Sequence, residues 1–365
     1  MTVVSYLTIS YAIECTTMNH LWLEFLRQQG ACYIGNTLSH FSEPQSELAA
    51  AAQSTIITAL CHRSMVRVTG DDAIGFMQGQ LTNDVTQVAD NYSQLSGYCN
   101  PKGRLFSILR LYRLHGDLYF SLPESLAEAT LDRLRKYVLM AKVQFEPTED
   151  MADMGIAGVD AESLLSTSLG DFPAQSGNAI HNQGYHVVRL PGQVPRFEIF
   201  STPQQLMALW QSLRKNENVW PTGLRPWQWL AVRAGEPQLF PATQEEFIPQ
   251  MMNFDAVDGL SFTKGCYPGQ EIVARMNYLG TLKRRMFLMH GDGEPTPEGS
   301  DVYNARDPSQ PVGKIAASQA APGNGFDCLA VLKIQAVEQG DLRAGSVDGI
   351  ALQRLQLPYS LPAKT

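Results

Sequence analysis

Hydrophobic and polar positions follow two different periods along this 365-residue chain. Short runs in which apolar and polar residues alternate are typical of half-buried strands, whereas apolar residues three and four apart are typical of helices with one buried face. Leu105–Leu114 is the strongest predicted strand. A turn at Gly116-Asp117 predicts a hairpin with a second strand at 118–120, and 138–145 is also strand-like. Pro203–Leu213 is a predicted helix. Together these elements predict an α+β fold with antiparallel sheets covered on one side.

The spacing of apolar residues changes beyond Gly280, where short β-like runs are separated by clusters of Gly and Pro. The runs are 285–290, 313–317, 328–334 and 350–355. They predict a small barrel or sandwich at the C-terminal end. We therefore expect a first α+β domain at 18–150, a second at 151–280 and a barrel at 281–365. Residues 1–17 are expected to be an extension outside the fold, because Met18-Asn19 resembles a start followed by a helix cap.

Composition limits the classes of function. A formal net charge of -8 argues against tight, sequence-independent binding to a nucleic acid backbone, so any link to RNA is expected to be indirect. The six cysteines lie far apart without a C-x-x-C pair, which favours a reducing compartment and no metal site. Residues 3–13 are apolar but too short to span a bilayer, and no basic region precedes them. We expect a cytoplasmic protein without a membrane partner.

Several common catalytic motifs are missing from the sequence. It contains no Walker P-loop, no H-E-x-x-H, no G-x-S-x-G and no dinucleotide-binding glycine pattern after a strand. Nucleotide hydrolysis and NAD chemistry therefore have no support. Seven histidines are scattered, and none is near Cys266 in the sequence, so a Cys–His catalytic pair has no positive evidence.

One segment concentrates residues with special chemistry, and we call it the Cys266 motif: Lys264-Gly265-Cys266-Tyr267-Pro268-Gly269-Gln270-Glu271. Its Pro-Gly pair predicts a turn that presents Cys266 on one side and Glu271 on the other. Positive charge on Lys264 and on Arg275, which follows the motif, would favour a reactive thiolate. The alternative is a buried, inert cysteine beside an ordinary turn. The sequence pattern alone leaves both interpretations open.

The Cys266 motif and several other segments resemble the YgfZ family, the folate-binding relatives of the glycine-cleavage T-protein. The other matching segments are Asp72-Ala73, QGQLTNDV at 78–85, Lys102-Gly103-Arg104, FIPQ at 247–250, Asn253 and LPYSL at 357–361. The resemblance runs from about residue 60 to the C-terminus. It implies two α+β domains around a central channel, followed by a small β-barrel. It also implies that tetrahydrofolate or a derivative is the cofactor, and that iron–sulfur proteins, including enzymes that thiolate tRNA, are the clients.

The resemblance also implies residues for a folate site. A pterin is flat and has donors and acceptors on its edge, so it needs an aromatic face and a polar edge partner, and the glutamate tail needs Arg or Lys. Trp227 and Arg196 match family positions, and Glu198 resembles the edge-binding glutamate of T-proteins. Arg63 or a neighbour stands where the family has a second tryptophan. The structural alternatives are core packing of Trp227 with Trp229, and solvated strand positions for Arg196 and Glu198.

The predicted strand at 105–114 bears on the reaction. T-proteins carry an acidic pair on the corresponding strand, but this chain has no Asp or Glu between Asn91 and Gly116. Moving an aminomethylene carbon needs a carboxylate beside the folate nitrogens. The first hypothesis is therefore a folate-binding accessory factor for iron–sulfur enzymes that affects tRNA thiolation. A folate-dependent aminomethyl or one-carbon transferase is the second, and a non-catalytic, chaperone-like binding module is the third.

Overall fold

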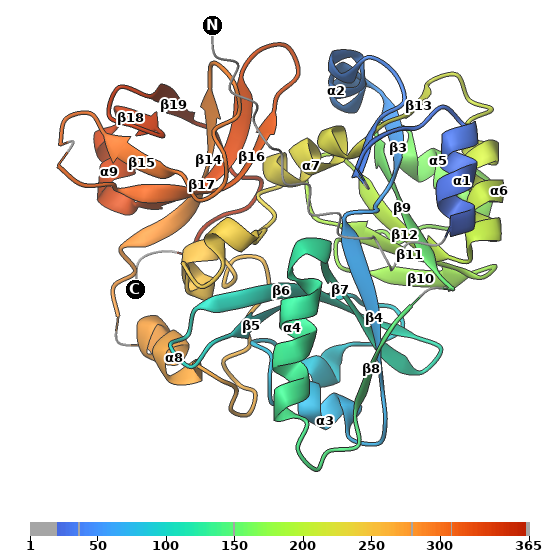
Figure 1. Ribbon diagram of the computed structural model, residues 1–365, viewed down its shortest axis with the longest axis horizontal. Coiled ribbons are helices and arrows are strands. Elements are labelled where there is room, and N and C mark those ends of the chain that lie inside the picture. The colour runs from blue at the N-terminus through green and yellow to red at the C-terminus, as the bar shows by residue number, and fades with distance from the viewer. Residues whose placement is uncertain (1–19, 36, 149, 279, 308, 363–365) are drawn as a thin grey trace, which may run out of the picture.

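The computed structural model describes residues 20–35, 37–148, 150–278, 280–307 and 309–362. The extension expected at 1–17 and the cap expected at Asn19 lie outside the described residues. Within the described part, two sheets pack against each other and a closed barrel lies beside them (Figure 1). This arrangement confirms the expected α+β fold with a small C-terminal barrel.

The first sheet is antiparallel and has the strand order β5-β6-β7-β4-β8. Its strands are β4 (Arg63–Thr69), β5 (Gln94–Cys99), β6 (Leu105–Leu114), β7 (Asp117–Pro123) and β8 (Gln144–Pro147). The helices α3 (Ala73–Gln78) and α4 (Glu124–Tyr137) cover one face and bury an apolar cluster against it. Strand β6 has the predicted bounds, because its continuous apolar run is buried between this cluster and the rest of the molecule.

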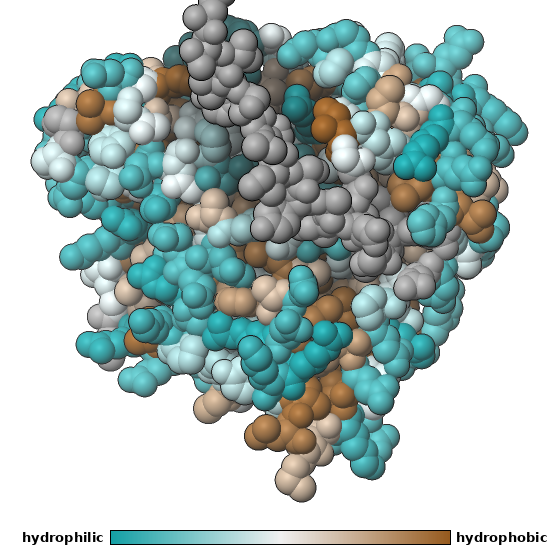
Figure 2. All heavy atoms as spheres, viewed as in Figure 1, coloured by the Kyte–Doolittle hydropathy of each residue, from teal (hydrophilic) through white to brown (hydrophobic). Residues whose placement is uncertain are grey.

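The prediction of a strand at 138–145 is wrong over most of that range. β8 begins only at Gln144, and the residues before it form a loop in which Leu139 is 87% and Met140 is 96% exposed. The chain leaves α4 here and must reverse to pair β8 with β4, so these apolar residues have no neighbouring strand. Figure 2 shows an apolar patch at the lower end of the molecule, where Figure 1 places this loop. None of the described helices is long and apolar enough to cross a membrane.

The second sheet has the order β10-β11-β12-β9-β3-β13, with β13 parallel to β3. Its strands are β3 (Thr55–Ala59), β9 (Ala152–Gly158), β10 (Ala179–Asn182), β11 (Tyr185–Leu190), β12 (Arg196–Ser201) and β13 (Val219–Pro221). The helices α1 (His20–Gln28), α5 (Ala161–Leu169) and α6 (Pro203–Leu213) cover one face. The other face contacts α2 (Pro44–Gln53) and α7 (Leu224–Arg233). A short hairpin of β1 (Cys32–Ile34) and β2 (Thr37–His40) precedes α2.

The first part of the chain packs with this second sheet. β3 pairs with β9 along Thr55 to Ala59, and Trp22 of α1 packs with Trp210 of α6. Residues 20–59, which the expected boundaries assign to the first domain, therefore complete the second sheet. Local apolar spacing identifies a buried segment but does not encode which distant strand will pair with it.

The two sheets meet through a shared apolar core. Tyr112 and Leu114 of the first sheet belong to the same buried cluster as Ile56, Val188 and Phe200 of the second. Because the sheets join through this cluster, side chains from both can reach the same interior space.

The C-terminal strands close into a barrel in the order β14-β17-β16-β15-β18-β19. They are β14 (Arg284–Gly291), β15 (Asp301–Asn304), β16 (Gly313–Ala320), β17 (Phe326–Lys333), β18 (Leu342–Ala344) and β19 (Ile350–Arg354), with α9 (Ile334–Gln339) between β17 and β18. The two unpredicted strands, β15 and β18, are short. The surface helix α8 (Gln270–Tyr278) precedes the barrel, and only Val273 of its residues is buried.

A buried carboxylate joins the barrel to α7. Asp327 of β17 accepts hydrogen bonds from Trp229 Nε1 at 2.8 Å and lies 2.9 Å from His290 Nδ1. Arg233, also on α7, lies 3.6 Å from the same carboxylate. Since Asp327 is only 3% exposed, these contacts fix the orientation of α7 between the barrel and the second sheet.

We predict that Asp327→Ala lowers the free energy of unfolding by about 1–3 kcal/mol, because it leaves the indole N–H of Trp229 buried without an acceptor. Chemical denaturation measures this change. Asp292→Ala is the matched control, because Asp292 approaches the same His290 at 3.6 Å but is 74% exposed, and a change within about 0.5 kcal/mol is expected. Equal stabilities of the two variants would contradict the anchoring role of Asp327.

Candidate functional site

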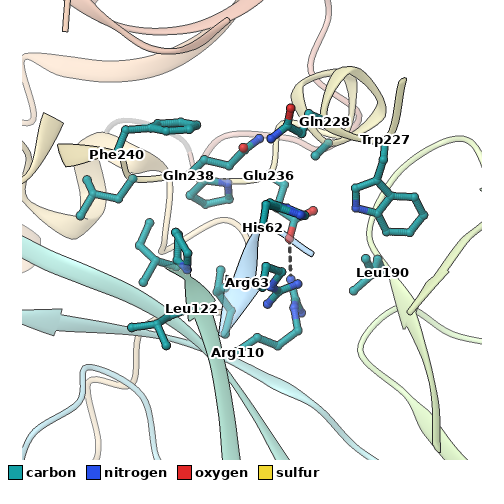
Figure 3. Close-up of a pocket in the computed structure, with 16 residues that line it drawn as sticks. His62, Arg63, Arg110, Leu122, Leu190, Trp227, Gln228, Glu236, Gln238 and Phe240 are labelled. Carbon is teal, nitrogen blue, oxygen red and sulfur yellow. Dashed lines mark hydrogen bonds and ion pairs between the residues drawn. The ribbon is translucent and has the colours of Figure 1, made fainter. Parts of the chain in front are cut away.

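The central pocket is a cavity of about 100 Å³ between the two sheets. Figure 3 shows its labelled lining, which comprises His62, Arg63, Arg110, Leu122, Leu190, Trp227, Gln228, Glu236, Gln238 and Phe240. These residues come from the first sheet, from the second sheet, from α7 and from the segment that follows α7. The pocket therefore exists only in the assembled fold.

The end of α7 places Glu236 in this pocket. Gly235 has a φ of +63°, and the N–H of Glu236 donates to the carbonyl of Ala231, as in a Schellman motif. A Cβ on Gly235 would lie 2.7 Å from Tyr359, so both the backbone angle and the close packing require glycine. The chain reverses at this residue and turns the next side chain inward.

Five charged side chains form a network between the sheets. Glu236 lies 2.8 Å from Arg110 and 2.7 Å from Arg196, and Glu198 lies 2.9 Å from Arg63. Tyr112 also donates to Glu198 at 2.9 Å. Three guanidinium groups therefore face two carboxylates in these ion pairs. The buried Asp153 also interacts with Arg63 and Glu198, and burial and the charge of Glu198 hold the pKa of its carboxyl well above its usual range.

The surroundings shift two pKa values at the pocket. Burial alone would raise the pKa of Glu236, but the charges of Arg196 and Arg110 outweigh it and lower this pKa to about 2. Burial lowers the pKa of His62 to about 3, and the charge of Arg63 adds to this effect. At neutral pH the pocket thus holds an ionised Glu236 and an uncharged His62.

Some polar atoms at the pocket have no protein partner. Among the described residues, Nδ1 of His62 and Nε2 of Gln238 are inaccessible to solvent and make no hydrogen bond. Behind them, Nε and Nη1 of Arg196 are also unpaired. Buried polar atoms are rarely left unsatisfied, so those that border a cavity are candidates to bind a ligand.

The four residues expected in the folate site divide into two pairs. Trp227 and Arg63 line the central pocket. Arg196 and Glu198 lie behind the pocket. Arg196 forms an ion pair with the lining residue Glu236, and Glu198 forms one with the lining residue Arg63. They are 1% and 0% exposed, so the alternative of solvated strand positions is wrong. Trp227 is 3% exposed and belongs to the shared core as well as to the pocket, so its packing and ligand-binding roles are compatible.

Trp227 is held in place on both sides. The guanidinium carbon of Arg196 lies 5.4 Å from the centroid of its ring. On β9, Gly155 leaves room for the indole, since a Cβ there would lie 2.5 Å from it. The ring is therefore fixed as a wall of the pocket before any ligand arrives.

An outer cavity of about 290 Å³ adjoins the central pocket. Tyr92, Asp258 and Tyr359 line it, and Arg110 and Glu236 border both spaces. The ion pair between Arg110 and Glu236 thus forms the partition between the central pocket and the outer cavity.

The Cys266 motif forms the predicted turn on the surface. Gly269 has a φ of +79° and packs so closely that a Cβ would lie 2.4 Å from the carbonyl of Asn100. Cys266 is exposed, so the alternative of a buried cysteine is wrong. It does not line the central pocket or the outer cavity.

Lys264 binds backbone carbonyls at the C-terminal end of α3. Its ammonium group donates to the carbonyl of Gln78, the last residue of the helix, and to that of Leu81, both at 2.5 Å. Burial lowers the pKa of Lys264 to about 8, although the nearby charge of Asp84 raises it. Lys264 therefore ties the motif to the segment 78–85. Glu271 and Arg275, the other two expected catalytic residues, are exposed on α8.

Sequence reasoning missed the polar pocket residues His62, Arg110, Gln228, Glu236 and Gln238. Two signals were available. Arg110 is a charge within a mostly apolar strand, and Glu236 and Gln238 lie in the long proline-containing segment that starts at Gly235.

Comparisons with known proteins agree with this architecture. The model of the GCVT N-terminal domain family matches residues 24–250. The chain is 31% identical over 307 residues to the tRNA-modifying protein YgfZ of Pectobacterium carotovorum subsp. carotovorum (strain PC1), across 83% of this chain and 89% of that protein. Its fold is similar to that of the glycine cleavage system aminomethyltransferase T from Bartonella henselae, with a TM-score of 0.71 at 16% identity, across 94% of this chain and 98% of the other. The chain belongs to the YgfZ family, and its fold is that of the glycine-cleavage T-protein.

Proposed function

We propose that this protein binds a tetrahydrofolate in the central pocket and acts as an accessory factor for iron–sulfur enzymes that modify tRNA. The observation that carries the proposal is the pocket itself, a cavity between the two sheets with an aromatic wall and surplus positive charge. The similarity to a tRNA-modifying protein supports the link to tRNA.

The lining suits the parts of a folate. Trp227 and Phe240 provide flat apolar surface for a pterin, with Leu122 and Leu239 nearby. Arg63 and Arg110 can attract the carboxylates of the glutamate tail, because the network contains one more guanidinium than carboxylate. When bound, tetrahydrofolate would supply one-carbon chemistry at its ring nitrogens, and the protein side chains would hold and orient it.

The carboxylates at this site favour binding over aminomethyl transfer. A general base or acid works best with a pKa near the working pH. Glu236 is the carboxylate that lines the pocket, and at a pKa of about 2 it is a weak base without a proton to donate. Glu198 is engaged by Arg63 and Tyr112. A transferase would instead turn over methylene-tetrahydrofolate, and an assay of this turnover with purified protein tests the alternative.

The surface position of Cys266 separates its role from the folate pocket. Since the thiol is exposed and lines neither cavity, we propose that it meets a client protein and does not touch the bound folate.

Trp227→Phe is predicted to weaken tetrahydrofolate binding about 10-fold in calorimetric titration, because the smaller ring loses stacking area. Phe also fits the core, so the fold is expected to persist. Trp220→Phe is the matched control, because Trp220 lies on β13, is 39% exposed and should leave affinity unchanged. Unchanged affinity in Trp227→Phe would exclude this ring from the site.

Glu236 is predicted to contribute stability that depends on pH. Its pKa is about 2 in the folded state and about 4.5 in the unfolded state, so its contribution is present above pH 4.5 and is lost as the pH falls towards 2. The difference in unfolding free energy between wild type and Glu236→Gln should therefore shrink by about 3 kcal/mol from pH 5 to pH 2. The half-exposed Glu246 provides a control, Glu246→Gln, for which no such change is expected. A constant difference for Glu236→Gln would show that its carboxylate is not held by the arginines.

Cys266→Ala should keep the wild-type affinity for tetrahydrofolate but fail to restore tRNA thiolation in a deletion strain. Cys32→Ala, a change at another exposed cysteine, should restore it. Full rescue by Cys266→Ala would remove the thiol from the function. A combined substitution of Arg63 and Trp227 in the same strain tests whether rescue needs folate binding.

A further inference from the structure

Two residues that line the central pocket, from different parts of the chain, each carry a buried polar atom without a hydrogen-bond partner among the described residues. His62 precedes β4 and contributes Nδ1, and Gln238 follows α7 and contributes Nε2. Both side chains project into the space between Trp227 and Phe240 in Figure 3. Neither atom reaches solvent, and neither has a hydrogen-bond partner among the described residues.

The chemistry of the two atoms is complementary. The side-chain amide nitrogen of Gln238 can only donate. A neutral imidazole nitrogen can accept when the ring carries its proton on the other nitrogen. The pocket therefore offers one donor and one acceptor, both uncharged, beside an aromatic wall.

A lactam edge, with a ring carbonyl next to a ring N–H, has the matching acceptor and donor. The pyrimidine ring of a pterin carries this edge. Glu198, the residue expected to read the pterin edge, is unsuitable, because it is fully buried behind the pocket and already bound to Arg63 and Tyr112.

We infer that His62 and Gln238 read the lactam edge of the pterin, with Gln238 donating to the ring carbonyl and His62 accepting from the adjacent ring N–H. The inference rests on the proposed folate function and names the residues that set its specificity. A site built to hydrogen bond a particular edge rejects an analogue without it, because the buried partners are then left unpaired.

The protonation state of His62 is consistent with this role. Its pKa of about 3 keeps the ring uncharged throughout the physiological range. Of the charged residues that line the pocket, Arg63 lowers this pKa and Glu236 raises it, and Arg110 is paired with Glu236. Affinity for the pterin should therefore show no step near pH 6.5, where an ordinary histidine titrates.

The test compares two probes: 5-formyltetrahydrofolate and its analogue in which a 4-amino group replaces the 4-oxo group. Wild type should prefer the 4-oxo probe by about 10-fold or more, because the 4-amino group turns a donor towards the donor of Gln238. Gln238→Leu should bind the 4-oxo probe at least about 10-fold more weakly and lose most of the preference. His62→Phe should also weaken binding of the 4-oxo probe.

Gln211→Leu, at an exposed position of α6, controls for the Gln-to-Leu change and should bind like wild type. If wild type binds neither probe, the proposed folate function fails. If wild type binds both probes equally, or if both pocket variants keep full affinity, only the inference that His62 and Gln238 bind the lactam edge is overturned. Equal binding of the two probes by wild type overturns the inference even if a variant does not fold.

Discussion

The ion pairs at the centre of the molecule all cross from one structural unit to another. Arg110 of β6 and Arg196 of β12 meet at Glu236, which follows α7. Arg63 of β4 meets Glu198 of β12. A buried charge that loses its partner costs about 3–5 kcal/mol, so each unit needs the others to keep its charges compensated. This constraint holds the two sheets at the spacing that leaves a pocket between them.

Regular elements were predictable where local sequence determines them. β6 is a long apolar run, and α6 begins with Pro203 after a capping threonine, so both have the predicted bounds. Which strands pair with each other was not predictable, because the pairing of β3 with β9 depends on residues about a hundred positions apart. Of the site, Trp227 and Arg63 were predicted through family resemblance, whereas His62 and Gln238 become visible only when their unpaired atoms are seen to border one cavity.

The fold separates two kinds of chemistry that the sequence places close together. The segment after α7 first lines the central pocket and then leads to the Cys266 motif on the surface. Lys264 fixes this motif to the end of α3 and the residues that follow it. A ligand in the interior and a partner at the surface can thus be bound by one continuous stretch of chain without competing for the same atoms.

The contact between Tyr359 and Gly235 has a consequence for synthesis of the protein. The phenol donates to the carbonyl of Gly235 at 2.8 Å and packs on the turn that directs Glu236 inward. A ribosome makes Gly235 more than a hundred residues before Tyr359. The nascent chain can form its sheets early, but the turn beside the pocket receives its last support only when the end of the barrel segment has emerged. An unfinished chain therefore lacks one of the contacts that support the wall of the central pocket.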